Sequence, residues 1–181
     1  MARVPYVDGE DLDPEYQDLI VSSLQPGKRV NVYSAIANNP DVLDGLRTFL
    51  GSLWADSGLS DRQRELVILT AASEVNSAYE WHQHVGIARD AGITDAEIAA
   101  LARDDREPFS DDERTLVAYA RAVVRGRVTD ELHEATVDHL GTEATVGAAS
   151  VAAGYLALGR VIDTLDVELE EGDEFYGWDP R

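Results

Sequence analysis

Residues 62–101 read RQRELVILTAASEVNSAYEWHQHVGIARDAGITDAEIAAL, and the spacing of their apolar side chains decides the fold class. Apolar residues recur every three or four positions through 61–75 and again through 77–91, which predicts two amphipathic helices joined by a tight turn. Gly92 is a natural stop for the second helix, and a third begins soon after it. This stretch therefore predicts helical packing.

Three further signals extend the helical pattern along the chain. SDRQ at Ser60, TDAE at Thr94 and SDDE at Ser110 each fit a capping box, with a hydroxyl at the N-cap and Gln or Glu three residues later. No stretch alternates as a strand does. We expect one all-α domain spanning residues 1–181, with an acidic tail from about residue 168. The predicted helices lie near residues 13–24, 30–37, 41–56, 61–75, 77–91, 95–103, 111–126, 129–139 and 143–165.

The composition narrows the classes of function. The chain has no cysteine, which excludes disulfides, thiolate catalysis and Cys-based zinc sites. It carries 35 acidic and 15 basic residues, for a net charge of -20, so the basic face that nucleic-acid binding needs is missing. A uniformly acidic, lysine-poor surface is typical of a protein from a salt-loving organism, where salt screens the self-repulsion. The alternative is an ordinary acidic protein.

The sequence also indicates in which cellular compartment the protein is expected. The most apolar stretch, near 151–161, is rich in Ala and Gly and is broken by Arg160, so no membrane span is expected. The N-terminal MARVPYVDGEDLD contains no apolar signal core. We therefore expect a cytoplasmic protein that does not bind membranes.

Helical wheels place several polar side chains on apolar faces. In the helix 77–91, Ser77, Glu80 and His84 lie in the same arc as Trp81, whereas His82 lies opposite and is expected to face solvent or a partner. In the helix 61–75, Glu65 is a carboxylate at the centre of an apolar stripe. If the two stripes meet, two carboxylates and an imidazole share a dry site, which raises at least one carboxyl pKa and suits proton transfer.

Other interpretations of the same residues stay open. Glu80 and His84 are an i, i+4 pair that can serve only as a helix staple, and Arg160 or Arg121 can neutralise Glu65. A divalent ion held by Glu65, Glu80 and His84 is the competing chemical interpretation, but the HEXXH spacing is absent. We expect no metal and no cofactor.

Residues 62–101, with the runs REL, YEW, HV and AGIT in order, resemble the core motif of the carboxymuconolactone decarboxylase family, which includes alkyl hydroperoxidase D-like proteins. Weaker similarity extends to VPYVDGEDLDPEYQDL and FSDDERTLVAYARAVV. The resemblance implies an all-α, alkyl hydroperoxidase D-like helical bundle. It also implies assembly into homotrimers or homohexamers, with the pocket near the subunit contacts.

The resemblance also implies roles for individual residues. The glutamate and histidine of the family's hydroperoxidase relay match Glu65 and His84, but the two relay cysteines fall on Ser77 and Glu80, which cannot form a disulfide. The cysteine-free decarboxylase branch is the closer match. In that branch Glu80 and His84 are the acid/base pair and Glu65 supports them.

These observations lead us to expect decarboxylation or proton transfer on a small lactone or carboxylated ring. Ser77, Trp81 and Tyr155 are expected to support the pocket, although Trp81 and Trp54 also suit a core or subunit interface. Arg160, or an arginine of another subunit, would hold an anionic substrate, because Arg89 points away. The alternatives are a non-catalytic binding or assembly module and a peroxidase-related function without a redox cysteine pair.

Overall fold

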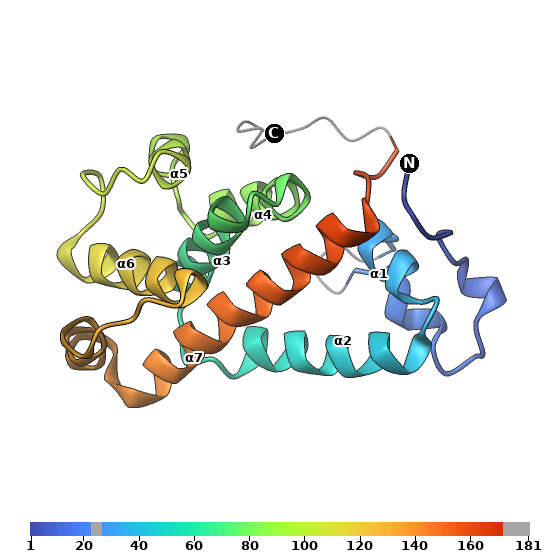
Figure 1. Cartoon of the computed structure of the whole chain (residues 1–181), viewed down its shortest axis with the longest axis horizontal. Helices are drawn as coiled ribbons and strands as arrows, with labels where there is room; N and C mark the ends of the chain where they lie inside the picture. Colours follow the sequence, from blue (N-terminus) through green and yellow to red (C-terminus); the bar gives the residue numbers. More distant parts are fainter. Residues whose placement is uncertain (23–26, 172–181) are drawn as a thin grey trace. The chain divides into compact units, whose positions relative to one another are not determined.

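The computed structural model describes residues 1–22 and 27–171, and the regular secondary structure of these residues is helical apart from one isolated bridge between Val21 and Arg29. They divide into two compact units. The first is built from residues 1–52 and the described residues from Val161 onward, and the second from Leu53–Arg160. The helices α2 and α7 contribute residues to both units (Figure 1).

The first unit holds two 3-10 helices, Gly9–Asp11 and Gln17–Ile20, and the α-helix α1 (Asn31–Ile36). It also holds most of α2 (Pro40–Ala55) and the end of α7. The predicted helix over 13–24 is wrong. Val21 is extended and pairs with Arg29, so contact with a later segment overrides the local helical pattern. Residues 23–24 of that prediction lie outside the described chain.

The second unit contains α3 (Asp61–Val75), α4 (Ala78–Asp90), α5 (Asp95–Ala102), α6 (Asp111–Arg125) and most of α7 (Asp130–Leu165). The helix α3 contacts α4, α5 and α6 and is its central element (Figure 1). All three predicted capping boxes form, and they fix the starts of α3, α5 and α6. The predicted break between helices 129–139 and 143–165 is real, because Gly141 has non-helical dihedral angles inside α7.

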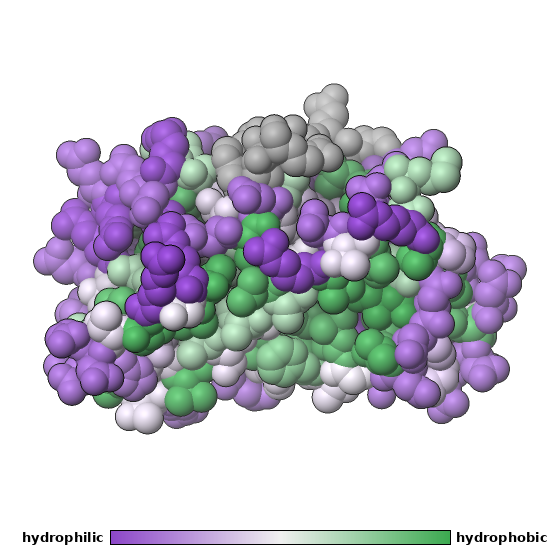
Figure 2. All heavy atoms as spheres, viewed as in Figure 1, coloured by the Kyte–Doolittle hydropathy of each residue, from purple (hydrophilic) through white to green (hydrophobic). Residues whose placement is uncertain are grey.

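An apolar core joins the helices of the second unit. Side chains from α3, α4, α5 and α6 pack together with the loop residues Ile93 and Phe109. Around this core, hydrophilic side chains dominate the part of the surface where α5 and α6 lie (left in Figure 2). On the face seen in Figure 2, this part of the second unit is therefore mainly hydrophilic.

The helix α7 is long and apolar enough, by length and composition alone, to cross a membrane. No such segment was expected from the sequence. Of the most apolar window of α7, 56% is buried inside the protein, and core helices also meet this criterion of length and composition. The fold is the all-α bundle expected from the sequence. Of the predicted acidic tail, residues 168–171 are described, and Glu170 accepts a hydrogen bond from the backbone of Asn31 in the first unit.

Candidate active site

The turn between α3 and α4 sets the geometry of the candidate site. Asn76 adopts the left-handed conformation (φ 58°) that ends α3, and the Ser77 hydroxyl then caps α4 by accepting from the Glu80 backbone N–H at 3.3 Å. The two helices consequently pack against each other along their length. Ser77, expected as a supporting pocket residue, therefore positions the first turn of α4.

Glu65 and His84 meet across these two helices. The Glu65 Oε2 atom lies 2.9 Å from His84 Nδ1; Glu65 is fully buried and His84 is 6% exposed. In the tautomer that carries its proton on Nδ1, His84 donates this hydrogen bond to Glu65 and keeps a lone pair on Nε2. The second carboxylate oxygen of Glu65, Oε1, has no hydrogen-bond partner. Neither Arg160 nor Arg121 neutralises this carboxylate: Arg160 is exposed, and Arg121 pairs with Glu74 and Asp104.

Glu80 lies one helical turn before His84 and is 2% exposed. Neither of its carboxylate oxygens has a hydrogen-bond partner, so the pair is not a staple in this structure. Burial raises the pKa of Glu80 to about 8 and outweighs the Ser77 hydroxyl, which acts to lower it. At neutral pH this side chain is therefore mostly a neutral carboxylic acid.

Aromatic rings surround the imidazole of His84. The Tyr155 ring on α7 meets it edge-on, with 5.0 Å between centroids, and the Trp54 ring lies 6.0 Å away. The Trp54 indole N–H donates to the Tyr155 hydroxyl at 3.0 Å, and the Arg64 guanidinium covers the Trp54 ring at 4.0 Å. Tyr155 thus lies beside His84, and Trp54, which is distant from Tyr155 in the sequence, joins these side chains through its hydrogen bond.

Gly159 explains how α7 approaches the buried carboxyl group. A Cβ atom built on Gly159 would lie 2.6 Å from Glu80 Oε2 and 2.8 Å from a methyl carbon of Val75, which is closer than real Cβ atoms come. Tyr155 and Gly159 are one turn apart on α7, as His84 and Glu80 are on α4, so the two helix faces match turn by turn. The small-residue character of α7 serves this close contact, and Gly159 is a site residue that the sequence analysis did not single out.

Two expectations about α4 need correction. His82 was expected to face solvent or a partner, but it is 5% exposed, as is Tyr79 on the same side. The face of α4 opposite the apolar arc is covered at Tyr79 and His82 but exposed at Gly86 and Arg89, and a wheel does not show such a change along the helix. Trp81 was expected to support the pocket, but its side chain lies in the apolar core with Leu66 and Phe109. Among the described residues, no group of three His, Asp or Glu side chains is arranged to hold a metal ion.

Comparisons with known proteins identify a related family and a shared fold. Residues 40–124 match the model of the Carboxymuconolactone decarboxylase family. A search of curated proteins finds no match.

Solved structures show the same fold. An uncharacterized peroxidase-related protein from Ralstonia eutropha JMP134, described as an alkylhydroperoxidase AhpD core, is 20% identical with a TM-score of 0.81, covering 94% of this chain and 93% of its own. A peroxidase-related protein from Silicibacter sp. TM1040 is 19% identical with a TM-score of 0.79, covering 93% and 90%.

A third solved structure has a ligand. The debrominase Bmp8, solved as a cysteine-to-alanine variant in complex with 2,3,4-tribromopyrrole, is 17% identical with a TM-score of 0.75, covering 87% of both chains. At these identities the three likenesses establish the fold alone. This chain therefore has an alkyl hydroperoxidase D-like fold, and its residues 40–124 are similar to the carboxymuconolactone decarboxylase family.

Proposed function

We propose that this protein is an enzyme that transfers protons on a small ring-shaped substrate, with Glu80 as the acid, His84 as the base and Glu65 as the positioning residue. The observation that carries the proposal is Glu80 itself. Its carboxyl group is buried without a hydrogen-bond partner, and its pKa is raised to about 8. A group whose pKa lies close to the working pH is the most effective proton donor or acceptor.

The environment of each group supports a separate task. Glu80 keeps its proton at neutral pH and is available to donate it. Glu65 holds the His84 ring through Nδ1, so that Nε2 is available to accept a proton. Two carboxyl groups in different environments, one paired and one isolated, are the arrangement by which acid and base functions separate within one site.

A small planar substrate suits the neighbouring side chains. The rings of Trp54 and Tyr155 lie beside the His84 imidazole, and flat apolar walls favour a flat ring. The debrominase neighbour binds a substituted pyrrole, and the family name refers to a carboxylated lactone. The absence of cysteine leaves no dithiol for peroxide reduction or for thiol-dependent dehalogenation.

We propose decarboxylation of a carboxylated lactone as the reaction. The bond to the carboxylate carbon breaks, CO2 leaves, and the electron pair of that bond enters the conjugated ring system. Glu80 then supplies the proton that the resulting dienolate carbon needs, and His84 returns a proton to Glu80 from solvent. Each turnover therefore consumes one proton from solvent, which reaches the substrate carbon through His84 and Glu80, and the step needs no redox partner.

The test is turnover by matched variants in molar potassium chloride. CO2 release is measured from carboxylated lactones, together with deuterium incorporation into the product in D2O. Glu80→Gln and His84→Gln should each lower kcat by about 10²–10⁴-fold. Glu65→Gln should lower it less and shift its pH profile. Glu113→Gln is the control, because that carboxylate is paired with Arg62 outside the site.

Two results would reject this function. In the first, Glu80→Gln retains full turnover, which would remove the acid from the mechanism. In the second, no lactone or ring substrate binds or turns over, while each of the three site variants unfolds the chain. That outcome would favour the non-catalytic binding or assembly module.

Self-association is part of the proposal. Val146 on α7 is 60% exposed, and Ala153 and Ala157 are exposed on the same helix at i, i+4 spacing. Figure 2 shows apolar side chains along the part of α7 that faces the viewer. An exposed apolar helix face of this kind suits packing against a second copy. Light scattering after gel filtration should give a trimer or hexamer, and Val146→Glu should shift it toward monomer.

A further inference from the structure

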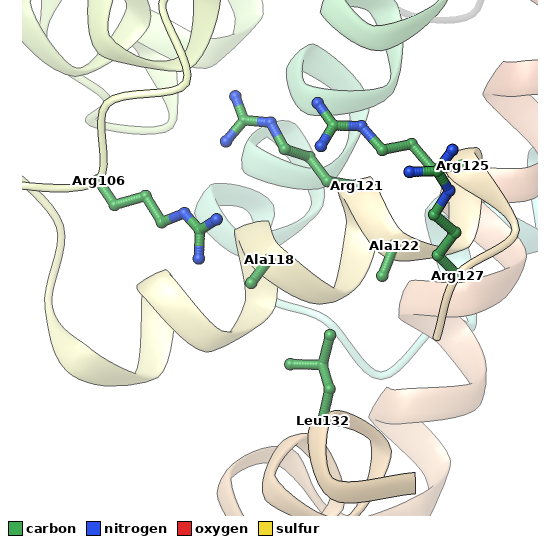
Figure 3. Close-up of a pocket in the computed structure, with 7 residues that line it drawn as sticks. All are labelled: Arg106, Ala118, Arg121, Ala122, Arg125, Arg127 and Leu132. Carbon is green, nitrogen blue, oxygen red and sulfur yellow. The ribbon is translucent and has the colours of Figure 1, made fainter. Parts of the chain in front are cut away.

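Four arginines surround one pocket on α6, away from the residues of the candidate active site. The pocket has a volume of about 340 Å³ (Figure 3). It shares no lining residue with the site around Glu80. Its lining residues are Arg106, Ala118, Arg121, Ala122, Arg125, Arg127 and Leu132.

The spacing along α6 builds this pocket. Ala118, Arg121, Ala122 and Arg125 follow the i, i+3, i+4, i+7 pattern of one helix face. The two alanines leave a hollow between longer side chains. Gly126 then ends α6 in the left-handed conformation (φ 64°), and Arg127 follows directly after this turn. Arg106 comes from the loop before α6 and Leu132 from the first turns of α7 (Figure 3).

Two of the arginines are held by carboxylates. Arg121 and Arg125 both bind Glu74, at 3.0 Å and 2.6 Å, and Arg121 also pairs with Asp104. These contacts attach α6 to the end of α3 and to the loop after α5. They account for Arg121 and Arg125 as structural residues.

The other two arginines are not accounted for in this way. The Arg106 Nε atom lies 3.8 Å from Asp104, beyond hydrogen-bond distance. Among the ion pairs and side-chain hydrogen bonds of the described residues, none includes the Arg127 guanidinium. The four guanidinium groups carry four positive charges, and Glu74 and Asp104 balance two of them. These groups together are therefore positive, in a chain whose net charge is -20.

We propose that this pocket binds a small organic anion, one with a single carboxylate or phosphate group and an apolar body. Guanidinium groups present paired N–H donors that match the oxygens of carboxylates and phosphates. Ala118, Ala122 and Leu132 provide an apolar wall for the rest of the molecule. The inference is independent of the proposed function, because it uses none of the residues of the Glu80 site.

The experiment is calorimetric titration of the full chain with phenyl phosphate and, separately, benzoate, in 0.15 M and 2 M potassium chloride. The ligand that binds more tightly identifies the preferred oxyanion. Saturable binding of one ligand per chain is expected, and it should weaken in 2 M salt because of screening. The double substitution Arg106→Gln with Arg127→Gln should weaken binding at least tenfold.

Matched variants make the outcome decisive. Arg89→Gln removes an exposed arginine that pairs with Asp95 elsewhere in the same unit, and it should bind as the wild type does. Ala122→Phe keeps all four arginines but fills the hollow, so it should also abolish binding. Absence of saturable binding by either ligand would overturn the proposal. Equal affinity in the double variant, or loss of binding in Glu80→Gln instead, would overturn it as well.

Discussion

The second unit contains a partly buried cluster of charged side chains around Arg62 and a fully buried carboxyl group at Glu80. At Arg62, one guanidinium binds Glu97, Glu113 and the Gly92 carbonyl, so every charge has a partner. At Glu80, a carboxyl group is more deeply buried and has no partner for either oxygen. A satisfied network holds a fold together, whereas an unsatisfied buried group destabilises it and is more often retained for chemistry.

The pKa values of the carboxyl groups follow this contrast. Burial alone would raise the pKa values of Glu97 and Glu113, but hydrogen bonds from Arg62 and from the cap residues hold both below their ordinary range. At Glu80 no cation opposes burial, the Ser77 hydroxyl lowers the pKa only in part, and the pKa rises to about 8. The ion pairs of Arg62 therefore hold α3, α5 and α6 together, whereas Glu80 remains protonated at neutral pH.

The largest expected effect is the pH dependence of stability that Glu80 contributes. The native state keeps the Glu80 proton up to pH about 8, and the unfolded chain loses it near 4.5. Between these values the native state binds more protons, so stability falls as pH rises. The upper bound is about 5 kcal/mol. The free energies of unfolding of wild type and Glu80→Gln, compared by denaturant titration from pH 4 to 9, should diverge steadily; a constant difference would contradict the account.

Removing Arg62 should lower the free energy of unfolding by less than the upper bound given for Glu80, but by more than the removal of an exposed arginine does. Arg62→Met leaves Glu97 and Glu113 without their shared cation in a partly buried place. We expect a loss of about 2–4 kcal/mol in the free energy of unfolding. Arg89→Met, which breaks the exposed pair with Asp95, should cost well under 1 kcal/mol. Equal losses in the two variants would remove the distinction between the clusters.

A methyl group on α7 should disturb the unsatisfied cluster alone. Gly159→Ala forces the new Cβ against the Glu80 carboxyl group and Val75, at a cost of about 1–3 kcal/mol. Gly86→Ala on α4 is the control, because a Cβ there meets open space, and it should stabilise the helix by about 0.5–1 kcal/mol. Thermal unfolding of both variants gives the comparison; similar melting temperatures would mean that α7 does not approach Glu80 closely.

The smallest expected effect comes from removing N-cap hydroxyls, and it distinguishes a cap beside the candidate site from a cap elsewhere. Ser77→Ala and Ser110→Ala each remove an N-cap hydroxyl and should each cost about 1 kcal/mol. Only Ser77→Ala should also raise the pKa of Glu80 further, since the Ser77 hydroxyl lowers it. Stability curves of both variants against pH test this, and an unchanged Glu80 titration would show that Ser77 acts as a cap alone.

Local sequence signals predicted the helices of the second unit well. The capping boxes at Ser60, Thr94 and Ser110 lie within four residues, so the sequence carries them directly. The burial of Glu65 and His84 was predicted because each lies among apolar residues at helical spacing. The predicted helix over 13–24 failed because Val21 pairs with Arg29 and the local pattern does not include that contact.

Contacts between segments that are distant in the sequence could not be predicted from local patterns. Trp54 and Tyr155 are 101 positions apart, and only the packing of α7 brings the Trp54 indole to the Tyr155 hydroxyl. The close approach of Gly159 to Glu80 has the same origin. His82 was misplaced because a helical wheel cannot show that this face of α4 is covered at its start and exposed further along. The lack of a hydrogen-bond partner for the Glu80 carboxylate oxygens became evident only from the positions of its neighbours on α3 and α7.

A direct titration of the Glu80 side chain tests the central claim. Infrared difference spectra of wild type and Glu80→Gln, recorded from pH 4 to 10 in molar potassium chloride, isolate the C=O stretch of this one protonated carboxyl group. The account predicts that the band persists through pH 7 and disappears with a midpoint near 8. A band that is already lost near pH 4.5 would show an ordinary, hydrated carboxylate and would contradict the account.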